Sequence, residues 1–182
     1  ANGFTGRFVC KELKRRNISF IALLRNKSQS YWMDKKKFNY RFADLNNSDE
    51  LTKAMHGCNV LLNVASLGFG SSENIINSCI KTGINRAVFV STTAIFTKLN
   101  AGSKKIRLNA EKNIKSSNLK WTIIRPTMIF GTPRDRNIIR LISYLEKIPF
   151  IPVFGDGNFL QQPVFVKDVA WSIVEVIYNK KT

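Results

Sequence analysis

The chain has 182 residues, of which 44% are hydrophobic, and its 29 Lys and Arg against 12 Asp and Glu give a net charge of +17. This length and apolar content suit one globular domain, and no apolar run reaches the roughly 18 residues of a transmembrane helix. The first residues also lack the pattern of a secretory signal peptide. Because the lysines are scattered, with one run of three at 35–37, we expect no nucleic-acid partner, although small anionic ligands such as nucleotides remain favoured.

The cysteines restrict the compartment and the chemistry. Cys10, Cys58 and Cys79 are odd in number, widely spaced and without a Cys-x-x-Cys pair. This pattern predicts neither a disulfide framework nor a structural zinc site. We therefore expect a cytoplasmic protein without a bound metal.

The first six residues, ANGFTG, match the tail of a G-x-x-G-x-x-G turn whose first glycine would precede Ala1. In dinucleotide-binding folds Gly3 would let the backbone approach a pyrophosphate, and Gly6 would let the first helix pack closely on the sheet. The cofactor-binding residues predicted here are Asn2, Gly3, Phe4, Thr5 and Gly6. We also expect the sequence to be a fragment that lacks the first strand. A helix start without any ligand is the alternative.

Apolar runs then alternate with helical patterns along the whole chain, which predicts repeated βαβ units. Strands are expected at 18–24, 40–43, 60–65, 86–91 and 121–124, and helices at 7–16, 49–56, 73–82, 104–116, 136–146 and 169–178, with 27–37 partly helical. The predicted fold is α/β, a Rossmann-type doubly wound parallel sheet. We expect one NAD(P)-binding domain over 1–182, with a cofactor-binding core at 1–125 and substrate-side loops and a last helix at 126–182.

The end of the strand at 18–24 indicates which dinucleotide is bound. An acidic residue there would bind the ribose 2′-hydroxyl of NAD, whereas a basic residue accepts the extra phosphate of NADP. The sequence has Arg25 at this point, so NADP is favoured over NAD; a solvated surface arginine is the alternative. Asp44 and Leu45 follow the next strand and suit the adenine amino group, although Asp44 would equally suit a turn.

Together these motifs resemble the short-chain dehydrogenase/reductase superfamily, in its extended or atypical branch of NAD-dependent epimerases and dehydratases. Each motif is weak alone, but their order and spacing match over essentially the entire chain. The matching segments are residues 3–6, 44–45, 63–66, 90–93, 125–127 and 163–170. The segment 125–137, RPTMIFGTPRDRN, is similar to nucleoside-diphosphate-sugar epimerases.

In that family a Tyr-x-x-x-Lys pair performs the redox chemistry: the tyrosine exchanges a proton with substrate, and the lysine lowers its pKa and holds the nicotinamide ribose. When Ala110-Glu111 is aligned with the family's Ala-Glu, the lysine position falls on Arg107 and the tyrosine position on Ser103. No tyrosine occurs between Tyr40 and Tyr144. The resemblance therefore gives Thr92, Thr93, Ser103 and Arg107 as candidate catalytic residues, with the usual tyrosine replaced.

The same resemblance assigns the rest of the site. It places Val64, Ala65, Ser66, Arg107, Pro126, Thr127 and Met128 against the cofactor, and Arg134, Arg136 and Gln162 on the substrate side. Arginines there would bind a diphosphate, although 134–136 would also suit a helix start. The implied function is an epimerase/dehydratase-like oxidoreductase or isomerase acting on a nucleotide sugar, with NADP or NAD as cofactor and a homodimer allowed. The alternative is a catalytically silent NADP-binding regulatory or assembly module.

Overall fold

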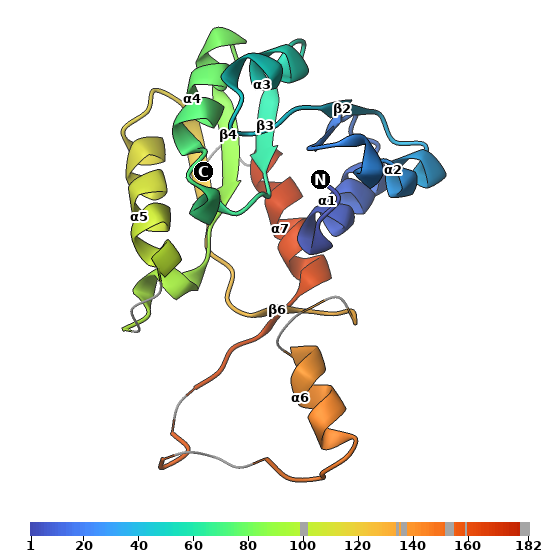
Figure 1. Cartoon of the computed structure of the whole chain (residues 1–182), viewed down its shortest axis with the longest axis vertical. Coiled ribbons are helices and arrows are strands. Elements are labelled where there is room, and N and C mark those ends of the chain that lie inside the picture. Colours follow the sequence, from blue (N-terminus) through green and yellow to red (C-terminus); the bar gives the residue numbers. More distant parts are fainter. Residues whose placement is uncertain (99–101, 134, 136–137, 152–154, 159, 179–182) are drawn as a thin grey trace.

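A computed structural model describes residues 1–98, 102–133, 135, 138–151, 155–158 and 160–178 (Figure 1). Its helices are α1 (Phe4–Arg15), α2 (Tyr31–Lys36), α3 (Ser48–Met55), α4 (Ser72–Lys81), α5 (Gly102–Lys115), α6 (Ile138–Leu145) and α7 (Val166–Tyr178). The strands are β1 (Ala22–Leu24), β2 (Tyr40–Phe42), β3 (Val60–Asn63), β4 (Arg86–Val90), β5 (Lys120–Ile124), β6 (Ile129–Phe130) and β7 (Val164–Phe165). Single 3₁₀ turns follow three of the strands: η1 (Lys27–Gln29), η2 (Leu67–Phe69) and η3 (Thr93–Phe96).

Every strand pairing among the described residues is parallel, as the alternation of strands and helices predicted. The strands form three sheets, β1-β2, β3-β4-β5 and β6-β7, rather than one continuous sheet. In the largest sheet, Val60 of β3 lies opposite Arg86 of β4, which in turn lies opposite Lys120 of β5. The α/β class and the Rossmann-type arrangement are confirmed.

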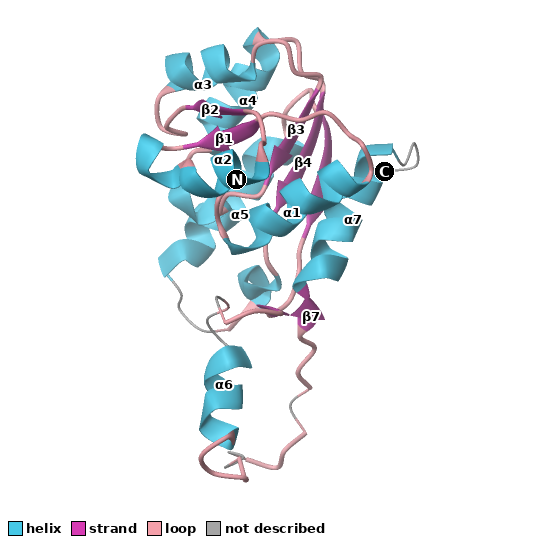
Figure 2. Ribbon diagram, turned by 90° about the vertical axis from the view of Figure 1, so that its right-hand side faces the viewer, coloured by secondary structure: helices cyan, strands magenta, loops and turns pink. Residues whose placement is uncertain are grey.

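Helices cover both faces of the β3-β4-β5 sheet (Figures 1 and 2). One face carries α3, α4 and α5, whose core includes Leu51, Ile75, Ile114 and the fully buried Phe89 of β4. The other face carries α1 and α7, and a third cluster joins α1 and α2 to β1. The last helix, α7, thereby packs in the same cluster as α1 and Val90 of β4.

Several element boundaries differ from those predicted. The first strand begins at Ala22 instead of residue 18, because Ile18 donates its backbone N–H to Leu13 O (2.9 Å) and belongs to the end of α1. Asn17, with a φ of 55°, makes that turn. The third predicted strand ends at Asn63, since residues 64–65 already turn toward the site. The predicted start of α6 at residue 136 lies outside the described residues.

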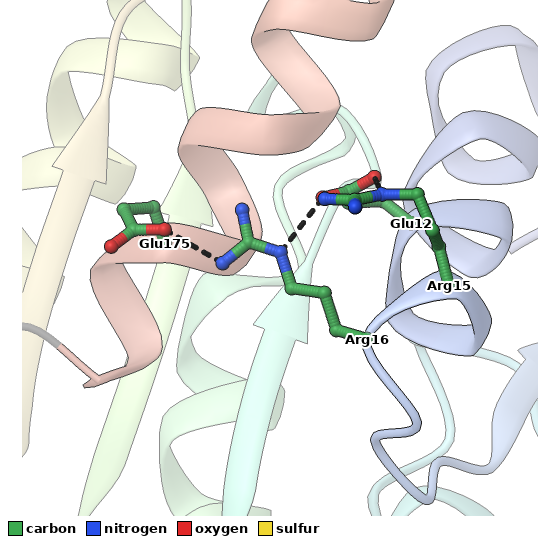
Figure 3. A network of polar contacts seen from close by, with 4 residues as sticks. All are labelled: Glu12, Arg15, Arg16 and Glu175. Carbon is green, nitrogen blue, oxygen red and sulfur yellow. Dashed lines mark hydrogen bonds and ion pairs between the residues drawn. The ribbon is translucent and has the colours of Figure 1, made fainter.

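A group of ion pairs joins α1 to α7 (Figure 3). Glu12 contacts Arg15 and Arg16, both at 2.7 Å, and Arg16 also contacts Glu175 of α7 at 2.6 Å. The Arg16 guanidinium additionally lies 5.8 Å from the ring centre of Trp171. Hydrogen bonding from Arg15, with help from Arg16, lowers the pKa of Glu12 to about 2.

Helix α6 stands apart from the sheets in both views (Figures 1 and 2). Its side chains Leu141, Ile142 and Tyr144 are exposed, as are Phe150 and Leu160 in the segment that follows. Within the described part of the chain, no helix is long and apolar enough to cross a membrane.

Candidate functional site

The glycine turn starts α1 in a form suited to an anion. Gly3 is the N-cap in an extended conformation, no side chain caps it, and the first turn contains no acidic residue. A Cβ on Gly3 would meet nothing within 4 Å, whereas a Cβ on Gly6 would lie 2.2 Å from the Ala1 carbonyl oxygen. Gly6 is therefore required by close packing, whereas the space at Gly3 is open, and the approach of a diphosphate there stays a prediction. Phe4 and Thr5 form the first helical residues beside it.

The loop after β1 is bonded to this turn through Gln29. The Asn2 side chain donates to Gln29 O at 3.0 Å, and the backbone N–H of Arg25 donates to the Gln29 side-chain oxygen at 3.3 Å. The Arg25 side chain itself is exposed. Arg25 thus begins a loop that is hydrogen-bonded to Asn2 in the glycine turn through Gln29, and its contact with the ribose of the adenosine stays a prediction.

Asp44 forms a turn at the end of β2. Its Oδ1 accepts from Asn46 N at 2.9 Å, and its own N–H donates to the Glu50 carboxylate at 3.1 Å. Asp44 therefore does act as a turn residue, which was one of its two predicted roles. Its contact with adenine stays a prediction. Leu45 is partly buried against the core, and its carbonyl accepts from Asn74 at 3.1 Å.

The residues after β3 form a tight turn at the same edge. Val64 contacts the α1–α7 core, the Ala65 carbonyl accepts from the Asn63 side chain at 3.3 Å, and Ser66 Oγ accepts from Gly68 N at 3.2 Å. These bonds fix a backbone that would line the cofactor cleft of a Rossmann-type fold.

The ends of β4 and β5 meet at the nicotinamide end of the predicted site. Thr92 Oγ1 accepts from Ala94 N at 3.2 Å, and Thr93 N donates to the carbonyl of Pro126 at 3.1 Å. Thr127 Oγ1 donates to the backbone carbonyl of Gln162. Met128 is exposed, and its carbonyl accepts from Val164 N at 2.9 Å. The structure therefore joins the predicted cofactor residues 126–128 to Gln162.

The side chains of Ser103 and Arg107 on α5 are hydrogen-bonded to each other. Arg107 Nη1 donates to Ser103 Oγ at 2.7 Å, one helical turn away. The guanidinium lies against η2, because a Cβ on Gly68 would lie only 3.3 Å from Arg107 Nε. The pair thus occupies the family's Tyr-x-x-x-Lys spacing, but a serine hydroxyl cannot replace a phenol as the acid, and arginine stays charged.

A buried ion pair, which the sequence analysis did not predict, supports this end of the site. Arg125, which directly follows β5, donates from Nε and Nη2 to the Glu111 carboxylate of α5 at 2.9 and 2.5 Å. Burial alone would raise the pKa of Glu111, but the hydrogen bonds and charge of Arg125 outweigh it and the pKa is lowered. Arg125 also lies 5.8 Å from the ring centre of Phe96 in η3. In the sequence, Glu111 serves only to align this helix with the family. Its partner Arg125 is 14 positions away along the chain and comes close only after folding.

The predicted substrate arginines, Arg134 and Arg136, lie outside the described residues. Between them, Asp135 is buried, and its Oδ1 accepts from Ile139 N at 2.9 Å in the first turn of α6. This contact agrees with the helix-start interpretation for Asp135.

Comparison with known proteins agrees with the geometry of the glycine turn. The family described as NAD(P)H-binding matches residues 1–179. The chain belongs to this family. The cofactor that this family implies is NADP or NAD, and the chain is similar to proteins of the short-chain dehydrogenase/reductase superfamily.

Three proteins that the chain is similar to differ in kind. Short-chain dehydrogenase/reductase family 42E member 1 of Mus musculus is 27% identical over 59% of the chain and 34% of its own length. NADH dehydrogenase (ubiquinone) 1 alpha subcomplex subunit 9, mitochondrial, of Arabidopsis thaliana is 24% identical over 97% of the chain and 48% of its own length. A nucleoside-diphosphate-sugar epimerase structure from Staphylococcus aureus has a TM-score of 0.75 at 19% identity, covering 99% of the chain and 65% of that protein. The chain thus spans a third to a half of the length of the two curated relatives.

Proposed function

We propose that this chain is an NADP-binding module of a regulatory or assembly type, and that it holds the dinucleotide without turning it over. The observation that carries the proposal is the Ser103–Arg107 pair, bonded at 2.7 Å where the family's acid and its lysine would stand. Reduction of a carbonyl by hydride requires a proton donor at the same time. The Ser103 hydroxyl accepts a hydrogen bond from Arg107, and an aliphatic hydroxyl is a far weaker acid than the phenol of tyrosine, so it is a poor donor of that proton.

The Arabidopsis relative supports an assembly role. Its name describes a subunit of a larger NADH dehydrogenase, and it matches 97% of this chain. A bound dinucleotide would then stabilise the fold of the module, since a ligand that binds only the native state raises its stability by mass action. The proposed compartment is the cytoplasm, because free thiols persist there. The structure has three free cysteines, Cys10, Cys58 and Cys79.

The second candidate is an oxidoreductase or isomerase that acts on a nucleotide sugar. The name of the Staphylococcus aureus structure and the position of Thr92 and Thr93 at the end of β4 favour it. Those hydroxyls would orient the substrate, and the proton would have to come from another group.

The test is binding and turnover measured on the same sample. We expect NADP to raise the melting temperature and to bind by calorimetry, with no oxidation of NADPH or release of product across a panel of nucleotide sugars. Turnover with any of them would overturn the silent module in favour of the second candidate. If neither NADP nor NAD binds, both functions fail.

If the wild type shows no turnover, a variant with the family's Tyr-x-x-x-Lys pair put back tests whether the missing pair is the cause. Ser103→Tyr combined with Arg107→Lys puts the family's pair back at positions that already face each other. If the nicotinamide end is otherwise intact, this double variant oxidises NADPH with a small carbonyl substrate while the wild type does not. Ser103→Phe with Arg107→Lys is the matched control, because it adds the ring without the phenol.

A further inference from the structure

We propose that Arg7 is a second cation for the 2′-phosphate of NADP and acts together with Arg25 to select NADP over NAD. The inference rests on the proposed dinucleotide site and names two residues that set its specificity. Arg7 lies in the second turn of α1, directly after the glycine turn, and Arg25 lies after β1.

The Arg7 guanidinium is held from two sides. Its Nε donates to Asn2 Oδ1 at 2.7 Å and to the Asn2 carbonyl at 3.1 Å. Its carbon lies 5.0 Å from the centre of the Trp32 ring on α2. A cation fixed in this way loses little side-chain entropy when a ligand arrives, so more of the interaction contributes to affinity.

Hydrogen bonds bring Arg7 into the same cluster as Arg25. Asn2, the partner of Arg7, donates its side-chain amide to Gln29 O at 3.0 Å, and Gln29 accepts the backbone N–H of Arg25 at 3.3 Å. The glycine turn, the start of α1 and the loop after β1 are therefore one bonded unit. A ribose at the end of β1 would carry its 2′-phosphate into this unit, between the two arginines.

The surroundings strengthen the attraction. Beside Arg7 runs an open groove of about 320 Å³, whose other lining residues are Phe4, Phe8, Lys11, Trp32, Thr132 and Pro133. The aromatic side chains of this groove lower the local dielectric on one side of Arg7, which strengthens its charge-assisted hydrogen bonds. A 2′-phosphate brings negative charge to Arg7 and Arg25, whereas the 2′-hydroxyl of NAD is neutral.

The competing role for Arg7 is purely structural. Through Asn2 it would hold the glycine turn in shape, and its loss would then weaken NAD and NADP equally. The ratio of the two dissociation constants separates these roles, because only a phosphate contact changes the ratio.

The experiment measures the dissociation constants of NADP and NAD by calorimetry at one salt concentration. For Arg7→Gln we expect NADP affinity to fall about tenfold, the loss of one charge-assisted hydrogen bond, while NAD affinity changes less than about twofold. Arg7→Lys keeps the charge and should keep most of the preference. Arg15→Gln removes a cation from the far end of the same helix and should leave both constants unchanged.

The outcomes separate the two proposals. A wild type that binds neither dinucleotide overturns the proposed function. A wild type that binds both equally, or an Arg7→Gln protein with an unchanged ratio, overturns only this inference. If Arg7→Gln does not fold, Arg7→Met replaces it, because methionine keeps an apolar stem beside Trp32 but removes the charge, and it must lower the preference for NADP that Arg7→Lys retains.

Discussion

The two ends of the candidate site are built from different parts of the chain. The diphosphate and adenosine end is mostly backbone: a glycine turn, an uncapped helix start and a loop bonded to both through Gln29. The nicotinamide end relies on side chains, and there Ser103 and Arg107 bond to each other. Binding through backbone tolerates wide sequence change, whereas proton transfer depends on one side chain at one position. A chain can therefore keep the first capacity while its sequence departs from the second.

The largest expected effect concerns the ion pair that supports the nicotinamide end. Arg125→Met leaves the Glu111 carboxylate buried without its main partner, and we expect a loss of about 3 kcal/mol in the free energy of unfolding by urea. Glu111→Gln should cost less, because Arg125 is 29% exposed and can reach water. If the Glu111 variant proved the more damaging of the two, the buried carboxylate would not be the cause.

At the diphosphate end, two glycines give a matched comparison. Gly6→Ala places a methyl group 2.2 Å from the Ala1 carbonyl oxygen, so we expect a loss of about 2 kcal/mol in stability together with weaker dinucleotide binding. Gly3→Ala meets no neighbour within 4 Å and should leave the melting temperature almost unchanged. It should nevertheless weaken NADP binding, because the methyl group occupies the space where the diphosphate approaches. Equal binding by wild type and Gly3→Ala would mean that the diphosphate lies elsewhere.

The smallest expected effect on stability concerns the ion pair between Arg16 and Glu175, which lies at neither end of the candidate site. Arg16→Gln removes the ion pair with Glu175 but leaves the apolar packing of α1 on α7, and we expect a loss of about 1 kcal/mol in the free energy of unfolding with unchanged NADP binding. A fall in affinity as large as that of Gly3→Ala would show that the α1–α7 contact positions the glycine turn.

The same ion pairs predict a dependence of stability on pH. Folding lowers the pKa of Glu12 from its ordinary 4.5 to about 2, so the unfolded chain takes up this proton first. The stabilisation is complete above about pH 4.5 and is lost as the pH falls toward 2. In Glu12→Gln the curve of stability against pH should be flatter across this interval, and a curve parallel to that of the wild type would argue against the assignment.

The sequence predicted elements and their order better than it predicted contacts. The parallel α/β arrangement followed from apolar runs. The glycine turn was found because few residues other than glycine can occupy such a turn. The Glu111–Arg125 pair and the link from Asn2 to Gln29 were missed, since each joins residues that are adjacent only after folding. Ile18 was assigned to a strand because its apolar side chain fits a strand as well as a helix end.

The parallel pairing of all the described strands has a consequence for how the chain folds. The paired residues are separated along the chain by intervals that range from Ala22 with Tyr40 to Ile129 with Val164. No described strand pair is a hairpin that a short local loop could close, so each pairing must wait for a long crossover to be ordered. We expect refolding to be slower than that of a helical protein of this length, because every one of these pairings joins distant parts of the chain.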